Sequence, residues 1–237
     1  MIPNIPDIAV RTVESAPPHA GTMKSQKTVA GIDIGGEAKG NHLVIMQGTR
    51  IVWNNPGRET PEQMLEKCIE FDVAAVGIDA PCQWRIEETG RQAEKMLARM
   101  RISCFVTPTR ERASQSRFYD WMFNGESVYK VFVERFPLLN DVFAIGNRVC
   151  FETFPHAITC ALRGREATSA KAKNIQRRET LERAGVETRP LRNIDEVDAA
   201  LCALTANFLL EGWVDVYGDS AGGFIVVPSS TASSGNK

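Results

Sequence analysis

Two short apolar runs in the chain each end in an aspartate. The run AGIDI delivers Asp33, and the run VGIDA delivers Asp79. Ligands of open α/β sheets bind beyond the carboxyl ends of the strands. If these two strands are neighbours in one sheet, we expect the two carboxylates to lie close together at that edge. Two like charges held together are costly unless a cation neutralises them or one is protonated, so the pair indicates a metal site.

A late helix offers further acids. The segment NIDEVDAAL places Asp195 and Asp198 three residues apart, hence on one helix face. Acids in a first helical turn also favour the helix dipole, which accounts for Asp195 equally well. That account suits Asp198 less, because Asp198 lies a turn deeper and precedes Ala199 and Ala200. Small residues beside an inward-facing acid would let the helix approach a sheet closely.

Glu152, in the apolar run CFETFP, is the fourth candidate acid. A buried acid in a strand needs a chemical reason, whereas an exposed one needs none, and strands alternate their faces. Both alternatives stay open for Glu152. Of the histidines, only His156 stands near a candidate acid in the sequence, and no serine-elbow motif competes.

Sites rich in carboxylate oxygens suit Mg²⁺ or Mn²⁺. Two such ions about 4 Å apart can activate water and stabilise the leaving oxygen in phosphodiester hydrolysis. The acids therefore favour a divalent-metal-dependent hydrolase.

An α/β fold must position these residues. The predicted strands, of which the first three form an antiparallel meander, are 27–34, 42–48, 50–55, 73–81, 148–155 and 222–228. The predicted helices are 60–71, with Thr60 as N-cap, 157–164, 170–184 and 194–212, with Asn193 as N-cap. We expect a mixed sheet of five or six strands with helices on its faces.

The region between the fourth and fifth strands, about 85–145, is predicted to be a helical insertion. It has helical composition over 91–101, an irregular segment over 104–115, and an amphipathic helix over 118–136 that is interrupted at Gly125. We expect one domain over 27–228, flanked by a disordered leader (1–26) and a disordered tail (229–237).

Composition narrows the function classes. The net charge is −1, so nucleic-acid binding would have to come from local basic patches. The six cysteines form no Cys-x-x-Cys pair, which argues against structural zinc. No apolar run reaches the ~20 residues of a membrane helix, and no signal peptide is evident. These features predict a cytoplasmic protein with reduced thiols and no membrane partner, and they leave the oligomeric state open, a homodimer included.

Four motifs carry a resemblance to a known family. GIDIGG, VGIDAP, ETFP and DEVDAALCALTA, with the order of elements around them, resemble an uncharacterised family of predicted nucleases in the ribonuclease H-like superfamily. The resemblance spans about 27–228 and implies an RNase H-like α/β fold and a metal-dependent nuclease. It implies Asp33 as a ligand that bridges two ions, with Asp79 and Asp198 holding one each and Asp195 or Glu152 completing the shell.

The Asp-x-x-Asp at 195 and 198 is similar to the arrangement in RuvC-type Holliday-junction resolvases. The chain departs from that pattern at Asp79, where glutamate is usual. Because aspartate reaches less far, the spacing of the ions would differ.

A nucleic-acid partner would contact basic residues. Lys39 and Arg91 are the predicted phosphate contacts. Three basic runs could add to them, although each is also typical of a solvated helix face: 91–101, 110–117 and 171–183. DNA and RNA are not distinguished.

Two other functions fit parts of the sequence. A non-catalytic RNase H-like scaffold that binds a partner would carry the same motifs. GIDIGG also resembles the first phosphate loop of ATP-binding sugar kinases and actin, in which Gly35 and Gly36 would face the phosphates. That function needs a second glycine-rich loop, for which GDSAGGF (218–224) is the candidate, and the chain is short for two such domains.

Overall fold

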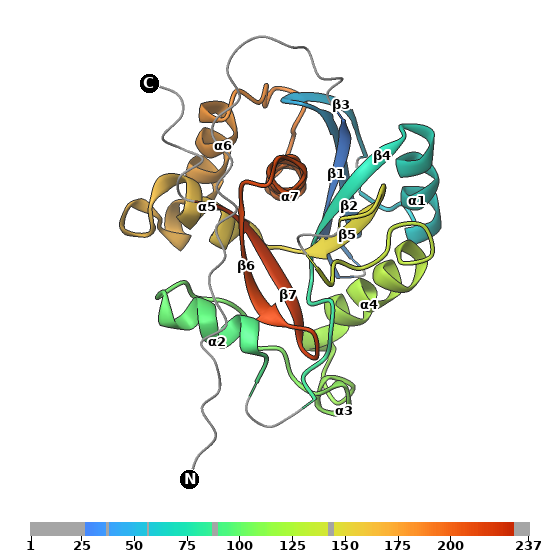
Figure 1. Ribbon diagram of the computed structural model, residues 1–237, viewed down its shortest axis with the longest axis vertical. Coiled ribbons are helices and arrows are strands. Elements are labelled where there is room, and N and C mark those ends of the chain that lie inside the picture. The colour runs from blue at the N-terminus through green and yellow to red at the C-terminus, as the bar shows by residue number, and fades with distance from the viewer. Residues whose placement is uncertain (1–26, 37, 56, 87–89, 142–144, 230–237) are drawn as a thin grey trace.

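The computed structural model describes residues 27–36, 38–55, 57–86, 90–141 and 145–229 (Figure 1). The predicted leader and all of the predicted tail except Ser229 lie outside these residues. The backbone N–H of Ser229 donates to the Trp213 carbonyl, which ties the end of the last strand to the residue just before β6.

A seven-stranded mixed sheet forms the centre, in the order β3-β2-β1-β4-β5-β7-β6. The strands are β1 (Thr28–Ile34), β2 (Asn41–Gln47), β3 (Arg50–Asn54), β4 (Val73–Asp79), β5 (Val149–Glu152), β6 (Val214–Asp219) and β7 (Gly223–Pro228). β1, β2 and β3 form the antiparallel meander, β4 and β5 run parallel to β1, and β6 pairs antiparallel with β7. This confirms the mixed α/β sheet that the sequence and the resemblance predicted.

The sheet has more strands than the five or six predicted. The additional strand is β6, which pairs with β7 in a hairpin. The segment 218–224, considered above as a phosphate loop, comprises the end of β6, the turn 220–222 of this hairpin and the start of β7. Asp219 Oδ1 accepts the backbone N–H groups of Ala221 and Gly222, at 3.1 and 2.6 Å. Those donors are therefore satisfied within the turn, which removes the second loop that the kinase interpretation needs.

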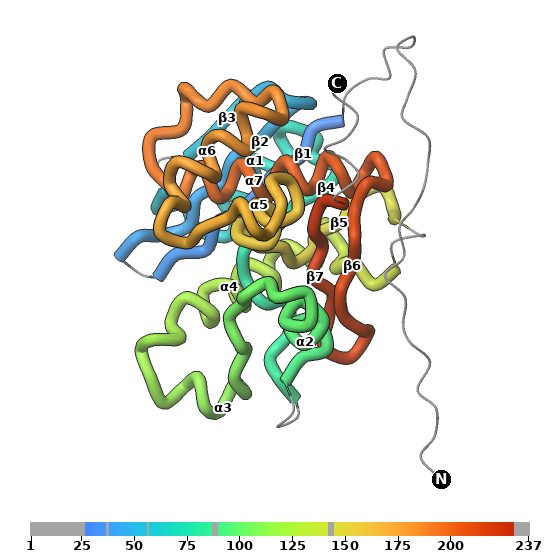
Figure 2. Tube along the Cα trace, turned by 90° about the vertical axis from the view of Figure 1, so that its left-hand side faces the viewer, coloured from blue at the N-terminus to red at the C-terminus, as the bar shows by residue number. Residues whose placement is uncertain are grey.

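Helices cover both faces of the sheet. They are α1 (Pro61–Glu70), α2 (Gln92–Arg99), α3 (Arg110–Ala113), α4 (Asp120–Phe132), α5 (Pro155–Arg163), α6 (Lys173–Arg183) and α7 (Ile194–Glu211). α7 packs on one face of β1, β2 and β4, while α1 and α4 pack on the other face. In Figure 1, which looks almost along α7, α5 and α6 lie on the α7 side. Figure 2 shows α2 alongside the β6–β7 hairpin. Among the described residues, no helix is both long and apolar enough to span a bilayer.

Local signals in the sequence set the ends of two helices. Thr60 and Gln63 form the predicted capping box of α1, with Pro61 at its first turn. The Asn193 side chain caps α7 by accepting the Glu196 N–H at 2.8 Å. The Glu196 carboxylate in turn accepts the N–H of Arg192 at 2.8 Å. The start of α7, and with it the angle at which its acids project, is therefore fixed by its own residues.

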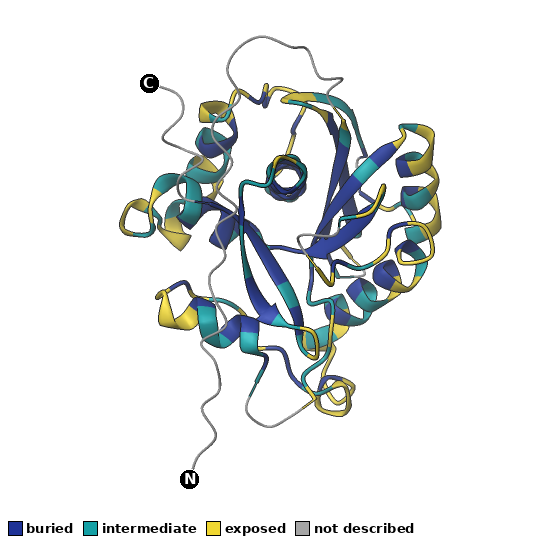
Figure 3. Ribbon diagram, viewed as in Figure 1, coloured by how far each residue is buried: buried dark blue, intermediate teal, exposed yellow. Residues whose placement is uncertain are grey.

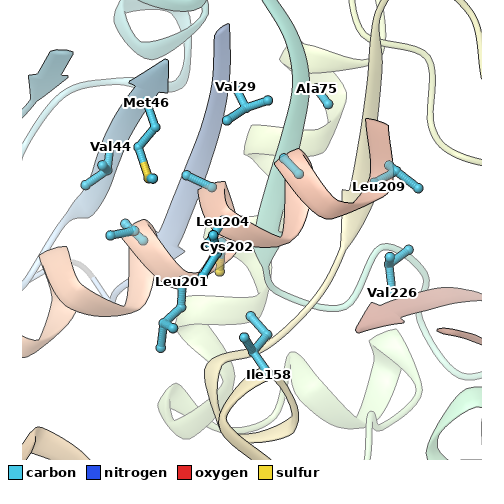
Figure 4. Packing of buried hydrophobic residues seen from close by; sticks show 14 of the residues in the cluster. Val29, Val44, Met46, Ala75, Ile158, Leu201, Cys202, Leu204, Leu209 and Val226 are labelled. Atoms are coloured by element: carbon cyan, nitrogen blue, oxygen red, sulfur yellow. The ribbon is translucent and has the colours of Figure 1, made fainter. Parts of the chain in front are cut away.

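α7 approaches the sheet closely because the strands beneath it carry glycine. A Cβ on Gly31 would lie 2.0 Å from the carbonyl oxygen of Ala199, and one on Gly77 would lie 2.6 Å from that of Cys202. Figure 4 shows α7 among side chains of β1, β2, β4, α5 and β7, and α7 is buried over most of its length in Figure 3. The contact brings the start of α7 to the carboxyl ends of β1 and β4.

Gly125 does not interrupt its helix, contrary to the prediction. α4 runs through it from Asp120 to Phe132. A Cβ on Gly125 would lie 2.7 Å from the Cβ of Ala80, so the residue serves close packing of α4 against the segment after β4.

Candidate metal centre

Three side chains meet at one edge of the sheet because of strand register. Asp33 and Asp79 are direct partners in the parallel pair of β1 and β4. Asp33 is also opposite His42 in the antiparallel pair of β1 and β2. Ile32 and Ile78, one position earlier, pack in the core on the α1 and α4 side. Because side chains alternate along a strand, the two aspartates and His42 face α7.

The first two turns of α7 bring Asp195 and Asp198 to the same place. Asp198 is 6% exposed and forms an ion pair with Arg177 of α6 through Oδ2, while its Oδ1 is buried without a hydrogen-bond partner. Asp195 is more exposed and pairs with Lys39 at 3.3 Å. Lys39 lies in the turn between β1 and β2, where the Gly36 carbonyl accepts its N–H. Gly35 and Gly36 thus follow β1, and the Gly36 carbonyl closes the turn towards β2 by accepting the N–H groups of Lys39 and Gly40.

The cluster is acidic enough to raise the pKa values of its carboxyl groups. Burial, followed by the charges of Asp79, Asp198 and Asp195, raises the pKa of Asp33 well above its usual value. Burial and the charge of Asp198 raise the pKa of Asp79 to about 7, against the opposing effect of Arg177. Burial raises the pKa of Asp198 to about 6, again opposed by Arg177. Because the pKa values of both Asp33 and Asp79 are raised, this pair binds a proton at a pH at which a free aspartate does not.

These shifts predict that the metal-free protein is more stable in mild acid. The folded acids bind protons at a pH where the unfolded acids, with a pKa near 4, do not, so stability is lost as the pH rises through about 6 to 7. Burial lowers the pKa of His42, which opposes this trend below about pH 6.5. We expect the melting temperature in a chelator to be about 5 °C higher at pH 5.5 than at pH 7.5. Asp79→Asn should flatten the difference, and a melting temperature that rises from pH 5.5 to 7.5 would contradict the prediction.

His42 is the site residue that the sequence did not reveal. It is 4% exposed, and one of its ring nitrogens, one Asp33 oxygen and one Asp195 oxygen all lie within 4.8 Å of one another. His156, the histidine that stood near a candidate acid, instead lies beside Cys160 on α5. The signal was available in the meander, because a short connection between two antiparallel strands places residue 42 opposite residue 33.

Glu152 points to the other side of the sheet. It is the β5 partner of Ile78, so it shares the face of Ile78 and not that of Asp79. Its two oxygens lie 2.9 and 2.6 Å from the guanidinium nitrogens of Arg91, and the Cys82 N–H donates to it at 2.8 Å. The alternation of faces places Glu152 apart from the acids that meet beneath α7, and its predicted catalytic role does not fit this placement.

Arg91 does not fit its predicted role as a phosphate contact. It is 3% exposed, and its Nε donates to the Gly222 carbonyl at 2.7 Å in addition to the bonds with Glu152. The pair joins the start of α2 to β5 and the β6–β7 turn, so it anchors the 85–145 region to the sheet. Lys39, the other predicted contact, is exposed at the edge of the acidic cluster.

Removing one partner of this pair should destabilise the fold. Glu152→Gln keeps the shape but removes the closest countercharge of the buried Arg91, which leaves only Glu94 at 3.7 Å. Loss of one partner of a buried ion pair costs about 3 kcal/mol. We expect thermal unfolding at a temperature about 9 °C lower. Glu70→Gln is the matched control, because Glu70 pairs with Lys67 on the surface and should change the melting temperature little. Equal melting temperatures for the two variants would refute an anchoring role.

The basic runs separate into different environments. Arg110 pairs with Glu126, and Arg117 pairs with Asp120, both at exposed positions. Arg178 donates to the carbonyls of Thr188 and Leu191. Arg177 alone among these reaches the acidic cluster, and the charge of Lys173, one turn earlier on α6, also acts on Asp198.

The comparison with protein families decides the chain's affiliation. The model of the family described as "Protein of unknown function (DUF429)" matches residues 31–221. The chain belongs to the DUF429 family. The region matched to DUF429 begins just before Asp33 and ends after Asp198, so it contains the whole acidic cluster.

Other comparisons add little detail to the DUF429 assignment. No curated protein matches the chain. Three solved chains match, and one of them is the RuvC protein of Thermus thermophilus, with 16% identity, a TM-score of 0.42, and coverage of 78% of this chain and 96% of that chain. This overlap is too loose to transfer any residue or activity.

Proposed function

We propose that the acidic cluster binds divalent cations and that the protein hydrolyses phosphodiester bonds of nucleic acid. One observation carries the proposal. Asp33 and Asp79 are adjacent carboxyl groups held together beneath α7, and among the described residues neither forms an ion pair with a lysine or arginine. The repulsion between them destabilises the fold unless a proton or a cation relieves it.

The donor set fits Mg²⁺ or Mn²⁺. Carboxylate oxygens are the preferred ligands of both ions, and Asp33, Asp79, Asp195 and Asp198 supply them. The buried Oδ1 of Asp198 has no hydrogen-bond partner, so this acceptor is left without a donor within the protein. When bound, divalent ions supply an activated water and neutralise charge on the leaving oxygen.

Cations at the rim suit a phosphate substrate. Lys39 and Arg177 each pair with one acid of the cluster, Lys39 with Asp195 and Arg177 with Asp198. A metal ion would compete for those acids, which would free both side chains to contact phosphate oxygens. Lys173 is exposed one turn from Arg177. We infer that the backbone of the nucleic acid passes over the turn 35–40 and the start of α6.

A non-catalytic scaffold is the second candidate, and the same ion pairs favour it. Lys39 and Arg177 neutralise Asp195 and Asp198 within the chain. In a scaffold these two ion pairs would be permanent. A proton bound by Asp33 and Asp79 would then relieve the repulsion between those two carboxyl groups without any metal.

Cleavage of a substrate panel tests the proposal. Single-stranded, duplex and branched DNA and RNA would be incubated with Mn²⁺ or Mg²⁺. We expect cleavage that falls at least about 100-fold in Asp79→Asn and in Asp198→Asn. Asp120→Asn is the matched control, because Asp120 is an exposed acid on α4 that pairs with Arg117 on the surface. If both site variants cleave as fast as the wild type, or if the wild type neither binds metal nor cleaves, the nuclease proposal is excluded. The non-catalytic scaffold would then be the remaining candidate.

A further inference from the structure

His42 is a buried histidine whose side chain is not satisfied by the protein. Its Nδ1 has no hydrogen-bond partner, and the residue is 4% exposed. A buried polar atom without a partner costs about 1–3 kcal/mol. A bound ion is one of the partners that accounts for such an atom.

The surroundings hold the ring at the acidic cluster. A Cβ on Gly57 would lie 2.7 Å from Nε2 and 3.0 Å from Cε1 of His42, so the backbone after β3 packs against one edge of the imidazole. Strand register places the ring opposite Asp33, and Asp195 approaches from α7. One atom from each of the three residues lies within 4.8 Å of the others, a spacing that a single ion can span.

We propose that His42 is a nitrogen ligand of the divalent ion held by Asp33 and Asp195, and that it makes this centre selective for Mn²⁺ over Mg²⁺. Imidazole is a good ligand for first-row transition ions, whereas Mg²⁺ prefers oxygen ligands alone. The inference rests on the proposed function to the extent that the cluster must bind a divalent ion. It goes further by naming a ligand and the class of metal that this ligand selects.

Pulsed electron paramagnetic resonance of the Mn²⁺-loaded full-length protein tests the ligand directly. A ligating imidazole gives ¹⁴N modulation of the Mn²⁺ signal, which we expect in the wild type and in His156→Gln but not in His42→Gln. Labelling wild-type histidines with ¹⁵N should change the same modulation without any substitution, so the test does not depend on how well His42→Gln folds.

Metal affinity provides the second measurement. Loss of a residue that merely supports a metal ligand weakens metal binding by roughly tenfold or more. Titration calorimetry should therefore show that His42→Gln weakens Mn²⁺ binding by at least about tenfold, while Mg²⁺ binding changes less. Two results would overturn the role of His42 and leave the proposed function standing. Either the wild type binds Mn²⁺ without nitrogen modulation, or the modulation is unchanged in His42→Gln. A wild-type protein that binds no Mn²⁺ would overturn both.

Discussion

Asp33→Asn is expected to lose metal-dependent cleavage by about 1,000-fold and yet to melt at a higher temperature than the wild type when metal is absent. The loss follows because a metal centre supplies several kcal/mol of transition-state stabilisation, and each 1.4 kcal/mol is a factor of ten. The gain in stability follows because the substitution removes a buried acid from beside Asp79 and Asp198. We expect a rise of about 5 °C in the metal-free melting temperature, measured in a chelator.

Addition of Mn²⁺ should raise the melting temperature of the wild type but not that of Asp33→Asn. Binding to the native state raises the melting temperature with ligand concentration, so wild-type protein should be stabilised by Mn²⁺ and Asp33→Asn should not. Asp195→Asn is the control, because Asp195 pairs with Lys39 and its loss leaves that cation unpaired. It should not raise the metal-free melting temperature. Equal Mn²⁺ stabilisation of wild type and Asp33→Asn would exclude Asp33 as a ligand.

Gly31→Ala should be the most destabilising single-methyl change near the site. Its Cβ would lie 2.0 Å from the Ala199 oxygen and 2.2 Å from the Ala203 nitrogen, and both are backbone atoms of α7. Overpacking against side chains costs about 1–3 kcal/mol, and here only a shift of the whole helix can relieve the contact. We expect a loss of more than about 4 kcal/mol in the free energy of unfolding, measured by urea denaturation, with much of the protein insoluble on expression.

Gly36→Ala is the matched control, five residues later in the same motif. A Cβ at Gly36 would meet no atom within 4 Å, and its φ is not in the left-handed region. We expect its stability to stay within about 0.5 kcal/mol of wild type. Similar stabilities for the two variants would show that α7 is not held against β1 as closely as the contact requires.

Figure 4 shows α7 packed over β1, β2 and β4. The acids of α7 reach those of the strands only if the helix axis is close to the sheet. Gly31 and Gly77 therefore help to assemble the acidic cluster although neither carries a functional group.

Periodicity and caps in the sequence were sufficient to place most elements. The β-branched runs predicted β1, β2, β3 and β4, and the capping residues of α1 and α7 fixed where those helices begin. These are local properties, because hydrophobic alternation and hydrogen bonds to the first turn depend on residues a few positions apart. The prediction missed β6 because apolar and polar residues alternate only weakly along it. Its extended conformation depends on its pairing with β7.

The sequence by itself determined which acids stand at strand ends and at the start of the last helix. Only the tertiary structure decided which of them meet. Register brought Asp33, Asp79 and His42 to one face, whereas Glu152, one position out of phase, turned to the other and paired with Arg91. A side chain's face depends on its position relative to a neighbouring strand distant in the sequence, and a shift of one residue reverses it.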